Sequence, residues 1–203
     1  MIKAIIFDID GTLVDSHEAN ISFYQSIFKV AGFKIPDKSL FDNFLHLSMI
    51  DTIKTLAPSS EDVEKLWNIG NQIKYPSQLQ KLFPFSQKVI SILSHNYKLA
   101  IVTNRRKEGV NNYFSLSRLE NYFSVIVAVE DVVNKKPHPE PLLLASERLA
   151  IKASECVYVG DACVDVLSAK AAGMKVITTN PLEGADEYFD SFEQLLLKIE
   201  KIQ

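Results

Sequence analysis

The stretch Ile5-Ile6-Phe7-Asp8-Ile9-Asp10-Gly11-Thr12-Leu13-Val14-Asp15-Ser16 decides the fold of this chain. The residues from Lys3 to Phe7 are mostly apolar and contain no Gly or Pro, which is typical of a strand buried on both faces. Alternation along such a strand sends Asp8 and Asp10 to the same side. Two like charges at the end of a buried strand are costly unless a cation lies between them. The sequence therefore predicts a site for a hard divalent cation with oxygen ligands, such as Mg²⁺.

The composition sets the broad class of protein. The chain has 203 residues, of which 47% are hydrophobic and 23% charged, as expected for a globular protein with more than one minimal domain. The net charge of −3 and the scattered Lys and Arg residues argue against a nucleic-acid partner. The apolar run before Asp8 is too short for a signal peptide or a membrane span. Two cysteines are too few for a disulfide framework, so we expect a reduced, cytoplasmic protein. The oligomeric state is left open.

Strands and helices alternate over most of the chain. Further apolar strands are predicted at 98–103, 124–129, 156–159 and 175–179, with helical patterns between them and at the C-terminus. This alternation predicts an α/β fold with a parallel sheet and right-handed crossovers. Residues 15–81 instead show one helical pattern after another. We therefore predict a Rossmann-like core formed by 1–14 and 82–203, into which a helical domain formed by 15–81 is inserted.

Polar residues follow each of the central predicted strands. Thr103 and Asn104 come after the second strand, Lys136 after the third, and Asp161 after the fourth. The carboxyl ends of parallel strands meet at one edge of the sheet, where open α/β sheets bind their ligands. We therefore expect these side chains to gather around Asp8 and Asp10.

The string Asp8-Ile-Asp-Gly-Thr-Leu-Val14, together with Thr103-Asn104, Lys136-Pro137 and Gly160-Asp-x-x-x-Asp165, resembles the four motifs of the haloacid dehalogenase-like hydrolase superfamily. The chain looks most like the phosphoglycolate phosphatase-like branch, which has a helical cap and also includes β-phosphoglucomutases and pyrophosphatases. The resemblance implies a Mg²⁺-dependent phosphatase that acts on a small phosphorylated metabolite through an aspartyl-phosphate. A dehalogenase is disfavoured, because those relatives lack a carboxylate at the position of Asp10.

The resemblance also implies a role for each motif residue. Asp8 would be the nucleophile, and the Asp10 side chain would protonate the leaving oxygen and then activate water. Mg²⁺ would be held by the Asp8 and Asp161 carboxylates and by the backbone carbonyl of Asp10, with Asp165 supporting these ligands from behind. The phosphate group would be bound by Gly11, Thr12, Thr103, Asn104 and Lys136, and Thr103 and Lys136 would also take part in catalysis.

The substrate is not fixed by these motifs. Residues 42–52 lack the Arg-x-x-x-Gly pattern of the branch, and Phe83 stands where the branch usually has Gly. A sugar phosphomutase that uses the same aspartyl-phosphate is one alternative, and a non-catalytic phospho-accepting module is another. Arg105 and Arg106 either meet a second anionic group or face solvent.

Overall fold

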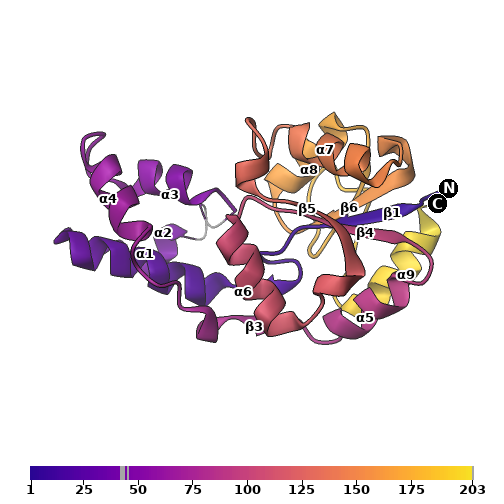
Figure 1. The fold of residues 1–203 in the computed structure, drawn as a ribbon, viewed down its shortest axis with the longest axis horizontal. Coiled ribbons are helices and arrows are strands. Elements are labelled where there is room, and N and C mark those ends of the chain that lie inside the picture. Colours follow the sequence, from indigo (N-terminus) through magenta and orange to yellow (C-terminus); the bar gives the residue numbers. More distant parts are fainter. Residues whose placement is uncertain (42–43, 45, 203) are drawn as a thin grey trace. The chain divides into compact units, whose positions relative to one another are not determined.

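The computed structural model of the protein describes residues 1–41, 44 and 46–202, and its larger sheet has six strands. Its strand order is β5-β4-β1-β6-β7-β8, and every neighbouring pair is parallel (Figure 1). The strands are Ala4–Phe7 (β1), Lys98–Val102 (β4), Phe123–Val127 (β5), Cys156–Gly160 (β6), Lys175–Thr178 (β7) and Glu187–Tyr188 (β8). The predicted Rossmann-like α/β fold is confirmed. Only the two-residue β8 of this sheet had no counterpart in the predicted pattern, because so short a strand leaves no periodic signal.

Alternation along β1 places apolar side chains on both faces of the sheet. Ile5 and Phe7 pack against α5 (Ser86–Leu93), α6 (Lys107–Ser117) and α9 (Phe192–Lys201). Ala4 and Ile6 lie in the opposite core, which is covered by α7 (Glu140–Leu149) and α8 (Cys163–Ala171) (Figure 1). Because both faces are buried, the strand needs apolar residues at every position.

The chain divides into two compact units, Met1–Asp15 with Leu82–Gln203 and, separately, Ser16–Lys81. The second unit is built from α1 (His17–Ala31), α2 (Lys38–Phe41), α3 (Met49–Leu56), α4 (Asp62–Gly70) and a short 3₁₀ helix, Ser77–Leu79. Its own hydrophobic core includes Ile27, Phe41, Ile53 and Leu66. Strands β2 (Val14–Asp15) and β3 (Lys81–Leu82) pair where the chain passes between the units. The assignment of 15–81 as a cap domain and of 1–14 with 82–203 as the catalytic core stays a prediction.

Two predictions from the sequence remain, one about the segment 42–52 and one about membrane-spanning helices. The unusual segment 42–52 includes residues 42, 43 and 45, which lie outside the described part of the chain. Among the residues that the structure describes, no helix combines the length and the apolar character needed to cross a bilayer.

Candidate active site

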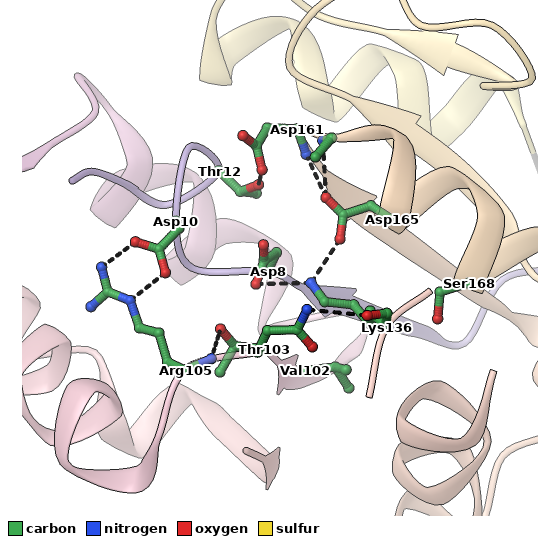
Figure 2. A network of polar contacts seen from close by, with 12 residues as sticks. Asp8, Asp10, Thr12, Val102, Thr103, Arg105, Lys136, Asp161, Asp165 and Ser168 are labelled. Carbon is green, nitrogen blue, oxygen red and sulfur yellow. Dashed lines mark hydrogen bonds and ion pairs between the residues drawn. The ribbon is translucent and has the colours of Figure 1, made fainter. Parts of the chain in front are cut away.

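The candidate active site lies at the carboxyl ends of β1, β4 and β6, which are neighbours in the sheet. Asp8 extends β1 by one residue, since its N–H donates to the Val159 carbonyl at 2.9 Å. Thr103 extends β4 in the same way, through a 3.0 Å bond to the Val127 carbonyl. Asp161 directly follows β6. Oxygen atoms of Asp8, Asp161 and Asp165 all lie within 4.8 Å of one another (Figure 2). The predicted gathering of these carboxylates is therefore present in the structure.

Lys136 lies buried among these carboxylates, with only 2% of its side chain exposed. Its Nζ atom donates to Asp165 Oδ1 and to the Tyr158 hydroxyl, both at 2.7 Å. The same Nζ is 3.1 Å from Asp8 Oδ1, which makes an ion pair without hydrogen-bond alignment. An ammonium group has three N–H donors, and three oxygen atoms, one each from Asp165, Tyr158 and Asp8, lie around this cation. The position of Lys136 is thus set by two strands and a helix at once.

The loop that carries Lys136 is also held by a residue after β4 and by a residue of α8. The Asn104 side-chain amide donates to the Lys136 carbonyl at 3.3 Å, and Ser168 on α8 donates to the His138 carbonyl at 2.9 Å. The Asn104 side chain therefore holds the backbone of the lysine loop, while phosphate binding was predicted for its backbone amide. A phosphate contact from its backbone amide stays a prediction.

The electrostatic balance of this cluster is negative. Burial, opposed by the Lys136 ammonium and reinforced by Asp165 and Asp10, raises the pKa of Asp8 from 3.8 to about 6. Burial and the neighbouring Asp165 and Asp8 carboxylates raise the pKa of Asp161 well above its ordinary value. Burial disfavours the Lys136 ammonium, but Asp165 and Asp8 outweigh it and raise the pKa of that group. One cation therefore faces three carboxylates, so a second positive charge beside them would be electrostatically favourable.

The donor set fits a divalent cation with oxygen ligands. Asp8 Oδ1 is buried and has no hydrogen-bond partner among the described residues, which leaves it available as a ligand. Asp161 Oδ1 accepts a long hydrogen bond, 3.4 Å, from the Thr12 hydroxyl. Asp165 differs, because its Oδ2 accepts hydrogen bonds from the backbone N–H groups of Asp161 and Ala162 while its Oδ1 binds Lys136. Asp8 and Asp161 thus suit Mg²⁺, and Asp165 fixes the loop that presents Asp161.

Two glycines allow the carboxylates to approach the backbone this closely. Gly11 has a φ of +65°, and a Cβ atom there would lie 2.0 Å from Asp161 Oδ2. A Cβ on Gly160 would lie 2.5 Å from the Asp165 carboxyl carbon. Any side chain at either position would displace a carboxylate from the site. The predicted phosphate-binding role of Gly11 and Thr12 is a separate matter and stays a prediction.

Asp10 faces away from the lysine and toward a residue whose role the sequence left open. Arg105 binds the two carboxylate oxygens of Asp10 with its Nε and Nη2 atoms, each at 2.5 Å (Figure 2). The Arg105 N–H also donates to the Thr103 hydroxyl at 3.2 Å. Tyr158 was missed entirely, because a tyrosine inside a buried strand looks like a core residue. The position of Arg105 directly after Thr103-Asn104 was the one available signal for its role.

Comparison with known proteins agrees with this fold. The family model described as haloacid dehalogenase-like hydrolase matches residues 5–179, and the chain belongs to this family. A pyrophosphatase PpaX from Bacillus pumilus is 30% identical over 202 residues, which cover 97% of this chain and 92% of that protein. The predicted family and the predicted hydrolase class are confirmed.

Solved structures show the same architecture. A HAD-superfamily hydrolase of subfamily IA, variant 1, from Geobacter sulfurreducens has a TM-score of 0.78 and 29% identity, and the match covers 98% of this chain and 96% of that one. CbbY from Rhodobacter sphaeroides, solved in complex with phosphate, has a TM-score of 0.81 and 23% identity over 96% of both chains. The second likeness concerns the fold alone.

Proposed function

We propose that this protein is a Mg²⁺-dependent phosphatase that hydrolyses a small phosphorylated metabolite through an aspartyl-phosphate on Asp8. The observation that carries the proposal is the buried Asp8 Oδ1 atom, which lies 3.1 Å from the Lys136 ammonium and has no other polar partner among the described residues. An oxygen with a free lone pair beside a fixed cation suits attack on an anionic phosphorus centre. The pyrophosphatase name of one relative also supports phosphorus chemistry.

The main obstacle to this reaction is charge repulsion. A carboxylate that approaches a phosphate oxygen at 4 Å faces about 4 kcal/mol of repulsion at an effective dielectric constant near 20. Such a penalty slows attack about a thousandfold if nothing offsets it. The Lys136 ammonium lies close enough to Asp8 to offset part of it. Bound Mg²⁺, held by Asp8 and Asp161, would supply the remaining positive charge and polarise the phosphoryl oxygens.

The proposed reaction has two steps. The Asp8 oxygen forms a bond to phosphorus while the bond from phosphorus to the leaving oxygen breaks, and Asp10 gives its proton to that oxygen. Water then attacks phosphorus, Asp10 takes the proton of the water, and inorganic phosphate leaves as the Asp8 carboxylate is restored. Thr103 and Asn104, at the end of β4, would bind the phosphoryl group during both steps. These roles agree with the positions of the residues around one strand-end edge.

Phosphate release from a panel of phosphorylated metabolites, with inorganic pyrophosphate included, tests the proposal. Wild-type protein is expected to release phosphate in the presence of Mg²⁺, and the Asp8→Asn variant is expected to lose at least a thousandfold of that activity. Asp190→Asn, which changes an exposed carboxylate in the same unit, is the matched control. Wild-type turnover by Asp8→Asn would refute the mechanism.

Phosphorus NMR on the same reactions separates the proposal from its alternatives. A phosphatase yields free phosphate, whereas a phosphomutase yields an isomerised sugar phosphate. A phospho-accepting module would instead accumulate a stable aspartyl-phosphate on Asp8 with negligible turnover.

A further inference from the structure

Arg105 is held in place by contacts with four residues. Its guanidinium binds both carboxylate oxygens of Asp10, and its Nη1 atom donates to the Gly109 carbonyl of α6 at 3.2 Å. At the backbone, its N–H donates to the Thr103 hydroxyl and its carbonyl accepts from Val129 at 3.0 Å. Only 10% of its side chain is exposed. A bidentate pair of this kind fixes the plane of the carboxylate as well as its position.

The helix beside Arg105 leaves space for this arrangement. A Cβ atom on Gly109 would lie 3.3 Å from Arg105 Cδ, which is tighter than ordinary packing, and 3.5 Å from Arg105 Cβ, which is an ordinary contact. Glycine is unfavourable inside a helix, because it loses more backbone freedom than alanine does. Gly109 therefore lowers the stability of α6 at the position where the Arg105 side chain lies against this helix.

The neighbouring arginine, Arg106, is more exposed and has a weaker ion pair. The Arg106 side chain is 43% exposed, and its Nε atom is 3.4 Å from the partly exposed Glu130 carboxylate. Exposed pairs of this length contribute little to stability. The two arginines have the same chemistry and adjacent positions, so Arg106 is a matched control for Arg105.

We propose that Arg105 is a positioning residue, which holds the Asp10 carboxylate in the orientation needed to accept the proton of water in the second step. The inference rests on the proposed function, in which Asp10 carries the proton in both steps. Asp10 lies in the turn after β1, and its side chain has two rotatable bonds that the arginine fork restrains. A misplacement of about 1 Å at a reacting group can cost about a hundredfold in rate.

Steady-state kinetics of Arg105→Ala test this inference. The variant is expected to lose tenfold to a hundredfold in kcat while its KM stays within twofold, because the side chain binds the Asp10 carboxylate, which is proposed to transfer protons. Arg106→Ala is expected to keep wild-type kcat and KM. Added guanidinium ion at non-denaturing concentration is expected to restore part of the lost kcat in a saturable way, whereas NaCl at equal ionic strength is not. Arg105→Lys keeps the charge but not the fork, so its kcat should lie between wild type and Arg105→Ala.

Gly109→Ala provides an independent test in which Arg105 itself is kept. The new methyl group should push the arginine away from Asp10 and lower kcat severalfold, while the alanine leaves the thermal midpoint unchanged or raises it. A loss of activity together with preserved stability separates positioning from a merely structural role. The inference is overturned if Arg105→Ala keeps wild-type kcat, or if its KM rises tenfold at unchanged kcat. Turnover by Asp8→Asn would instead overturn the proposed function, and the inference with it.

Discussion

Replacing the candidate nucleophile should stabilise the metal-free protein. In the folded chain the pKa of Asp8 is raised to about 6, mainly by burial, whereas in the unfolded chain this carboxyl titrates near 3.8. Between these two values the folded protein holds a proton that the unfolded chain has released. The stability that this group contributes is therefore fully present below about pH 4 and is lost as the pH rises through 6. Asp8→Asn has no charge to bury, so it should avoid this loss.

The size of the effect follows from the same pKa. The difference between 3.8 and about 6 corresponds to about 3 kcal/mol at pH 7. This value already includes the attraction of Lys136, which lowers the pKa of Asp8. Burial and the neighbouring carboxylates outweigh that attraction, so the net shift of the pKa is upward. We expect Asp8→Asn to be more stable than wild type by about 1–3 kcal/mol at pH 7 and equally stable near pH 4. At about 2–4 °C per kcal/mol for a chain of this size, the thermal midpoint should rise by roughly 5 °C.

Thermal or urea unfolding in EDTA from pH 4 to 7.5 measures this difference. Circular dichroism is the suitable probe, because the single tryptophan, Trp67, belongs to the unit Ser16–Lys81 and Asp8 to the other unit. Asp190→Asn should show no pH-dependent gain, because its carboxylate is exposed. The reasoning would be refuted if Asp8→Asn were less stable than wild type at pH 7, or if the difference did not change with pH.

Two further predictions concern the metal and the backbone of the site. Dialysis against EDTA should abolish phosphate release and Mg²⁺ should restore it, because the Asp8 and Asp161 carboxylates would otherwise lack counter-charge; activity that survives chelation would contradict this. Gly160→Ala should lower both kcat, by at least tenfold, and the thermal midpoint, because its Cβ would lie 2.5 Å from the Asp165 carboxyl carbon. Gly32→Ala, with a φ of +77° but no atom within 4 Å of its Cβ, should affect the midpoint alone, as kinetics and calorimetry on both variants would show.

Most of the fold was predictable because burial leaves a clear pattern in sequence. The strands around β1 are buried on both faces, so their apolar runs are continuous and easy to locate. The pairing of β2 with β3 was not predictable, because each has two residues and no periodicity. The unit Ser16–Lys81 was expected to be helical, and helices dominate it.

In the candidate site, too, some residues could be predicted from the sequence and others could not. Asp8, Thr103 and Asp161 each follow a strand, and parallel pairing alone brings such residues to one edge. The partners of these residues depend on side-chain directions that no local pattern records. Tyr158 lies within a strand as an apolar residue would, yet its hydroxyl binds the Lys136 ammonium.

The sequence by itself therefore determined the α/β fold, the strand-end cluster of acidic residues and the membership of a hydrolase family, because strand periodicity and motif spacing are local properties. Only the tertiary structure decided that Arg105 is bound to Asp10 while Arg106 is largely exposed. The two arginines are adjacent and chemically identical, and the position of Arg105 directly after Thr103-Asn104 is the only difference that the sequence shows between them. What separates them is the position of α6 and of the turn after β1, which comes from packing between segments about a hundred residues apart in the chain.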